Sequence, residues 1–128
     1  MAEEPVPGSE QAGQRGGLSV VTTAIDGVRV LHLTGEIDHH TCEPLRQALN
    51  TLTADRPRVV VDMSRVTFMD SSGINTLIVA YKNVTAADGW IRLAAPTAPV
   101  LRVLQLVRVD DLITCYPDLS QALAPQSP

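Results

Sequence analysis

The residues best suited to chemistry in this sequence are two adjacent serines, Ser71 and Ser72, which follow Asp70 and precede Gly73. At a helix start the first amide groups lack internal partners, and the helix dipole favours negative charge. We therefore expect a serine hydroxyl here to be exposed, on a loop between two rigid elements. The helix itself is predicted from apolar residues at three- and four-residue spacing, namely Ile74, Leu77, Ile78, Tyr81 and Val84.

The same four residues also have a purely structural interpretation. Asp and Ser are among the commonest residues at helix N-caps, so the D-S-S-G segment taken alone predicts a cap more readily than a functional site. The spacing of the residues does not separate the two interpretations.

A hydrolytic triad is one chemical alternative for this segment. Ser71 with His39 or His40, and with Asp38 or Asp62, supplies the residue types that such a triad needs. However, the serine lies in D-S-S-G rather than in the G-x-S-x-G turn of hydrolases, and both histidines lie in a polar loop. Phosphate-binding, dinucleotide-binding and H-E-x-x-H zinc motifs are absent from the sequence. We therefore expect no enzyme, no cofactor and no metal site.

The composition fits a single folded domain that needs neither a disulfide nor a metal. The chain has 128 residues, of which 45% are hydrophobic, and a net charge of −4. The negative charge and the few aromatic residues argue against nucleic-acid binding. No apolar stretch approaches the roughly 20 residues of a membrane-spanning helix, and the acidic N-terminus is unlike a secretory signal. Cys42 and Cys115 fit no metal-binding spacing and predict reduced thiols in a cytoplasmic protein, although the sequence does not exclude a disulfide.

Strands and helices alternate along most of the chain. Residues 1–17, rich in Gly and Pro, predict a disordered tail. Two strands follow at residues 18–25 and 28–34, joined by the hairpin dipeptide Asp26-Gly27. A loop at residues 35–40, a helix capped by Asp38 or Thr41 and a strand from Val59 come next. The helix after Ser72 has Gly89 as its left-handed C-cap and leads to a strand at residues 90–94. The last predicted elements are a helix capped by Thr97, a strand at residues 112–116 and a helix from Asp118.

The predicted element order is β-β-α-β-α-β-α-β-α. Strands separated by crossover helices pair in parallel, so we expect an α/β fold with one small, mixed, mostly parallel sheet and helices packed against it. The β-branched run at residues 59–61 is typical of a strand buried on both faces, and polar Asp62 and Ser64 interrupt it. His32 is predicted to be half-buried at the sheet edge.

Two segments together carry a resemblance to a known family. The sequence FMDSSGI, with VVVDMS just before it, follows the segment GEIDHHT at residues 35–41. This combination resembles the STAS-domain family, and most closely its bacterial anti-sigma factor antagonists. The resemblance covers residues 18–125, where it implies one STAS domain. Two departures are Asn75, where such proteins usually have a small residue, and residues 107–112, where they often carry a glycine.

The resemblance implies a regulatory function. In that family the first serine of the DSSG segment accepts a phosphate, and here that residue is Ser71. The unmodified protein would bind an anti-sigma factor that is also a serine kinase, a histidine-kinase-like ATPase, and so release a sigma factor. Phosphorylation would switch binding off, and a protein serine phosphatase would reset the cycle. The residues expected at the partner surface are Asp38, His39, His40, Asp70, Ser72, Gly73 and Asn75.

Ser72 is expected to be the structural serine, with its side chain turned towards the backbone as a helix cap or a first-turn residue, while Ser71 faces outward. Two other roles for a STAS domain remain open besides the hydrolase. One is a regulatory subunit of an ATP-driven lipid transporter. The other is a stressosome-type scaffold, although such proteins usually carry a larger N-terminal domain.

Overall fold

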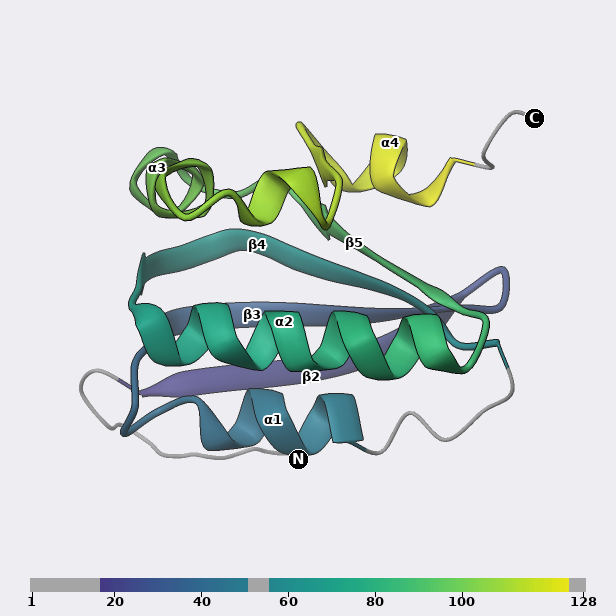
Figure 1. Cartoon of the computed structure of the whole chain (residues 1–128), viewed down its shortest axis with the longest axis horizontal. Helices are drawn as coiled ribbons and strands as arrows, with labels where there is room; N and C mark the ends of the chain where they lie inside the picture. The colour runs from purple at the N-terminus through teal and green to yellow at the C-terminus, as the bar shows by residue number, and fades with distance from the viewer. Residues whose placement is uncertain (1–16, 51–55, 125–128) are drawn as a thin grey trace, which may run out of the picture.

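The computed structural model describes residues 17–50 and 56–124, so the predicted tail lies almost entirely outside the described residues. Within these ranges the elements alternate in the order expected from the sequence (Figure 1). In chain order they are β2 (Leu18–Ile25), β3 (Val28–Ile37), α1 (Glu43–Asn50), β4 (Arg58–Met69), α2 (Ser71–Ala86), β5 (Trp90–Ala94), α3 (Ala98–Leu106), the 3-10 turn η1 (Val109–Asp111), β6 (Cys115–Tyr116) and α4 (Leu119–Leu123).

The strands form one mixed sheet in the order β2-β3-β4-β5-β6, which confirms the α/β prediction. The β2–β3 hairpin is antiparallel, and the other three pairings are parallel. Asp26 and Gly27 both have positive φ values, 51° and 81°, as a tight two-residue hairpin turn requires. The central strand is β4, and its residues Val59, Val60 and Val61 are fully buried.

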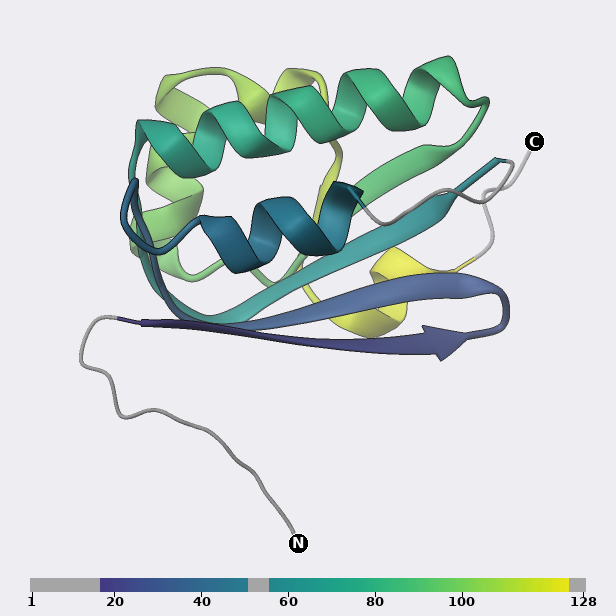
Figure 2. The same ribbon diagram turned by 90° about the horizontal axis from the view of Figure 1, so that it is seen from below.

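Helices cover both faces of the sheet, but unequally (Figure 2). Helices α1, α2 and α3 pack on one face over the main apolar core, which includes Leu31, Leu45 and Leu77. The short helix α4 packs on the opposite face over a smaller cluster. There the buried Arg92 donates from Nη1 to the carbonyl oxygens of Ala122 at 2.8 Å and Ala124 at 3.0 Å.

The strands differ from the prediction in their extents. β3 continues through Gly35 and Glu36 to Ile37, so only the second half of the predicted loop is a loop. β4 runs unbroken through Asp62 and Ser64 because a register shift between β3 and β4 accommodates the polar residues. The last strand is limited to two residues, because the amides of Leu112 and Ile113 donate back to the carbonyl oxygen of Val109 in the turn that follows η1.

His32 lies on an internal strand, so its predicted place at the sheet edge is wrong, although the side chain is half-buried as expected. Its Nδ1 donates to Asp62 Oδ2 at 3.0 Å across the β3–β4 pair, and its Nε2 lies 3.1 Å from Thr23 Oγ1. Burial raises the pKa of Asp62, but hydrogen bonds from Ser64 and His32 outweigh this effect and lower the pKa. The histidine is thus part of the sheet.

Two helix ends also differ from the prediction. After α2 the left-handed residue is Asp88, with φ 63°, and not Gly89. Gly89 is required for another reason, since a Cβ there would lie 2.0 Å from the carbonyl oxygen of Pro57. Thr97 is the N-cap residue of α3, but its hydroxyl donates to the carbonyl oxygen of Val66 at 2.7 Å instead of accepting from the helix.

Arg108 occupies the segment where the resembled family often has a glycine, and its backbone is left-handed with φ 62° and ψ 28°. This conformation costs an L-residue about 1 kcal/mol or more. We predict that Arg108→Gly raises the free energy of unfolding by about 0.5–1 kcal/mol, after the entropy cost of glycine. Urea denaturation measures this change in the free energy of unfolding. Arg102→Gly, in the exposed face of α3, is the control and should lower stability by about 1 kcal/mol; equal losses in both variants would contradict the prediction.

Candidate functional site

The D-S-S-G segment lies where β4 ends and α2 begins. Asp70 is the N-cap of α2, with extended backbone, and its Oδ1 accepts a hydrogen bond from the amide of Ser72 at 2.8 Å. Ser71 is the first helical residue and is exposed, as the sequence predicts, whereas Ser72 is half-buried. Of the two expected roles, Ser72 has that of a first-turn residue, because the carboxylate that caps α2 belongs to Asp70 and the Ser72 amide is its donor.

This cap supports a prediction on stability. Asp70→Ala removes the acceptor for the Ser72 amide and should lower the free energy of unfolding by about 1 kcal/mol. Ser72→Ala should change it by less than about 0.5 kcal/mol, since no cap is lost. Chemical denaturation of both variants provides the measurement. A larger loss in Ser72→Ala than in Asp70→Ala would contradict this assignment.

The loop after β3 is held by a reciprocal pair of hydrogen bonds. Asp38 Oδ1 accepts from the amides of His40 at 2.8 Å and Thr41 at 3.0 Å, while Thr41 Oγ1 accepts from the amide of Asp38 at 2.9 Å. The Thr41 hydroxyl donates to the carbonyl oxygen of Glu36 at 2.6 Å. Desolvation raises the pKa of Asp38, but these hydrogen bonds outweigh it and lower the pKa. The pair shapes the turn that leads into α1, which starts at Glu43.

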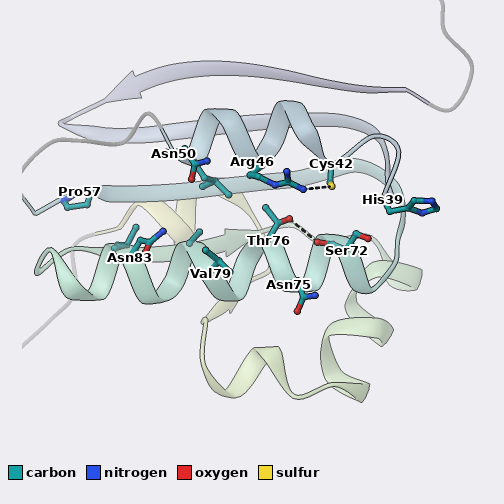
Figure 3. Close-up of a pocket in the computed structure, with 13 residues that line it drawn as sticks. His39, Cys42, Arg46, Asn50, Pro57, Ser72, Asn75, Thr76, Val79 and Asn83 are labelled. Atoms are coloured by element: carbon teal, nitrogen blue, oxygen red, sulfur yellow. Dashed lines mark hydrogen bonds between the residues drawn. The ribbon is translucent and has the colours of Figure 1, made fainter.

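The parallel pairing of β3 with β4 brings this loop next to the start of α2. Ile37 lies opposite Met69 in the register, and the amide of Asp70 donates to the carbonyl oxygen of Ile37 at 3.0 Å. Both segments therefore lie at the same end of the sheet, where the parallel strands β3 and β4 have their carboxyl ends. His39 from the loop and Ser72 from α2 line the same cavity (Figure 3).

The residues expected at the partner surface differ in exposure. His39, His40 and Asn75 are exposed, and Asp38 is half-buried, like Asp70 and Ser72. Gly73 is buried beneath two side chains of the core. A Cβ at this position would lie 2.7 Å from Met69 Cγ and 2.8 Å from Ile37 Cγ2, so the structure gives this glycine a packing role.

Phe68 is a surface residue that the sequence interpretation missed. It lies near the end of β4, two residues before Asp70, and 47% of it is exposed. Exposed Thr67 and Phe68 lie between buried Val66 and Met69, where the register between β3 and β4 shifts. Residues 66–69 show no period-2 pattern, so the sequence carried no local signal for this exposure.

The described residues do not assemble the hydrolytic triad. Asp62 is hydrogen-bonded to His32, and Asp38 accepts from backbone amides. Among residues 17–50 and 56–124, no hydrogen bond joins Ser71 to a histidine. The rings of His39 and His40 lie 3.9 Å apart between centroids, but the described part of the chain contains no group of three residues suited to a metal ion.

Comparison with known proteins identifies the class of protein. The family model for the STAS domain matches residues 19–122, and the chain belongs to the STAS-domain family. The anti-sigma-F factor antagonist RsfB of Mycobacterium tuberculosis is 30% identical over 82% of this chain and 88% of its own length. An anti-sigma F factor antagonist of Paenibacillus polymyxa is 28% identical over 76% of this chain and 85% of its own length.

Solved structures agree with this assignment. An anti-sigma factor antagonist from Mycobacterium paratuberculosis matches with a TM-score of 0.76 and 32% identity, over 83% of this chain and 91% of that one. SpoIIAA in its unphosphorylated form matches with a TM-score of 0.62 and 24% identity, over 76% of this chain and 87% of that one, which shows the shared fold. No described helix is long and apolar enough to cross a membrane.

Proposed function

We propose that this protein is an anti-sigma factor antagonist whose unphosphorylated form binds an anti-sigma factor. The observation that carries the proposal is the exposed Ser71 at the start of α2, beside the loop at residues 38–41. Relatives at 28–30% identity, aligned over most of their length, are named as such antagonists. We further propose that the anti-sigma factor is a serine kinase, that a protein serine phosphatase reverses the modification, and that the cycle operates in the cytoplasm.

Phosphorylation of Ser71 would act on the interface and leave the fold intact. A phosphate adds about −1.5 to −2 charge, and at the N-terminus of α2 the dipole favours that charge by about 0.3–1 kcal/mol. In an interface the same dianion lies beside the Asp70 carboxylate, and burying it without matched cations costs several kcal/mol. A loss of about 3 kcal/mol lowers affinity roughly a hundredfold.

A relative supports the existence of two such states. SpoIIAA from Bacillus has been solved in its phosphorylated form, which matches this chain with a TM-score of 0.60 and 23% identity. A switch of this kind needs no catalytic residue in the antagonist itself, so we propose that the protein is a substrate and not an enzyme.

The mass of the protein tests the proposal. The full chain is incubated with ATP and a candidate anti-sigma kinase encoded near its gene, and intact-mass spectrometry follows the product. We expect the addition of one phosphate and the loss of a complex that forms before ATP is consumed, as judged by size-exclusion chromatography. A complex that persists after complete phosphorylation of the protein would contradict the proposed switch.

A second candidate is a regulatory subunit of an ATP-driven lipid transporter. The STAS fold also occurs within a membrane transporter, since the murine anion transporter Slc26a9 matches with a TM-score of 0.67 and 18% identity over 22% of its chain. Affinity purification separates the candidates. A transport ATPase would copurify with a transporter subunit, and a histidine-kinase-like ATPase with an antagonist.

Phe68 supplies a prediction about the partner surface. Exposed aromatic residues often dominate binding energy at protein interfaces. We expect Phe68→Ala to weaken binding of the anti-sigma factor at least about tenfold, or 1.4 kcal/mol, with little change in stability. Isothermal titration calorimetry measures this. Leu106→Ala is the control, because Leu106 is 76% exposed at the end of α3, in a different element. Equal effects of both substitutions would exclude Phe68 from the interface.

A further inference from the structure

The phosphorylation switch assigns no ligand to the cavity that His39 and Ser72 help to line. It lies between α1 and α2 and has a volume of about 390 Å³ (Figure 3). Small-molecule sites in proteins typically have volumes of about 300–1,000 Å³ and combine an apolar lining with a few polar groups. This cavity therefore has the size of a ligand site.

The lining of the cavity has an apolar part, one cationic side chain and several neutral polar side chains, namely His39, Asn50, Ser72, Asn75, Thr76 and Asn83. Leu49 of α1 and Ala80 and Val84 of α2 are buried, and Val79 continues this surface outward. Arg46 is the only permanently charged side chain among the described residues of the lining, which include no carboxylate. The cavity is thus complementary to a molecule with an apolar tail and one negative charge.

The guanidinium of Arg46 has capacity for such a ligand. Its Nη1 lies 2.7 Å from Glu43 Oε1, and its Nη2 lies 3.6 Å from Cys42 Sγ. Arginine carries five N–H donors, so these two contacts leave donors for a carboxylate. Both side chains of the Arg46–Glu43 pair are 52% exposed, and such exposed pairs are weak. A ligand carboxylate can join or replace Glu43 at small cost.

The direction of the two helices orients the ligand. Figure 3 shows α1 running from Cys42 to Asn50 beside α2 running from Ser72 to Asn83, so the helices are parallel and both N-termini lie at the same end. Their dipoles favour an anion towards that end. The carboxylates of Asp38 and Asp70 also lie there and oppose an anion at the very end, although both are engaged by backbone amides. The anion consequently fits best at Arg46, one turn inward.

We propose that this cavity binds a small amphipathic carboxylate, with its anionic group against Arg46 and its hydrocarbon tail between Leu49 and Val84. The site does not depend on phosphorylation of Ser71. Its ligand class follows from the single guanidinium, the absence of a described carboxylate from the lining and the apolar surface of Leu49, Val79, Ala80 and Val84 among the neutral polar side chains.

Octanoate is a suitable probe for this site. Titration of the ¹⁵N-labelled full chain, followed by two-dimensional NMR, should give saturable shifts of amides in α1 and α2 around the cavity. Octylammonium at equal concentration should give no comparable shifts, because it would place a cation against Arg46. Equal binding of the two probes, or no saturable shift with octanoate, would overturn the proposal.

Two pairs of variants refine the test. Arg46→Gln should weaken octanoate binding at least about tenfold, or 1.4 kcal/mol, while Arg102→Gln on α3 should leave it unchanged. Val79→Glu adds a carboxylate to the cavity wall and should weaken octanoate binding about tenfold, whereas Leu106→Glu adds the same charge elsewhere and should not. The NMR spectra report whether each variant is folded. Unchanged binding in folded Arg46→Gln would show that the guanidinium does not hold the anion.

Discussion

Ser71→Ala is expected to abolish phosphate transfer and to leave a protein that binds the anti-sigma factor persistently. The exposed hydroxyl at the first position of α2 is the only group removed, and the Asp70 cap remains in place. The fold should therefore be unchanged. Tandem mass spectrometry after incubation with kinase and ATP locates the phosphate, and calorimetry measures binding before and after the reaction.

Ser72→Ala is the matched control, since it removes the neighbouring, half-buried hydroxyl. We expect this variant to be phosphorylated and to be released like the wild type. Ser71→Asp should weaken binding only partly, because a carboxylate brings one charge and lacks the third acceptor oxygen of a phosphate. Phosphate on Ser72, or transfer that survives in Ser71→Ala, would refute the assignment.

Gly73→Ala should destabilise the fold by about 2 kcal/mol, a typical cost of overpacking a buried site. The added methyl group would overlap Ile37 and Met69, which are both buried at the ends of β3 and β4. We expect the first turn of α2 to shift away from these side chains. Such a shift would also displace Ser71, so phosphate transfer should slow at temperatures where the variant is still folded. Thermal denaturation and a kinase assay on the same sample measure both effects.

Asn75→Ala is the control for Gly73→Ala. Asn75 lies two residues further along α2 but is exposed, and alanine is a better helix former. Stability should be unchanged or slightly higher. If Gly73→Ala were as stable as Asn75→Ala, the contact between α2 and the two strand ends would be looser than in the structure.

Local patterns in the sequence were sufficient for the fold but not for the limits of its elements. Helical spacing after Gly73 and the hairpin at Asp26-Gly27 depend on neighbouring residues, and both predictions are confirmed. The length of β4 depends on its partner, because Asp62 stays within the strand through its bond to His32 of β3. A bond between residues 30 positions apart leaves no local pattern in the sequence.

The site shows the same division between local and tertiary information. The sequence placed Ser71 at an exposed helix start, which the structure reproduces, whereas its function remains a proposal. The choice between Asp70 and Ser72 as the cap depended on one hydrogen bond that both residue types can make. The cavity beside Arg46 arises where two helices meet, so it could not be predicted from either helix alone.

Trp90 of β5 is a built-in optical probe for the packing of helix α4. Arg92 donates hydrogen bonds to carbonyl oxygens at the end of α4, and its guanidinium carbon lies 3.7 Å from the centroid of the Trp90 ring. Trp90 is the only tryptophan in the chain. Release of α4 would free Arg92 from those carbonyls and change the surroundings of the indole. Tryptophan emission would therefore follow the small apolar cluster under α4, while circular dichroism follows the longer helices of the main core. A difference between the two transitions would reveal α4 as a separate unit of unfolding.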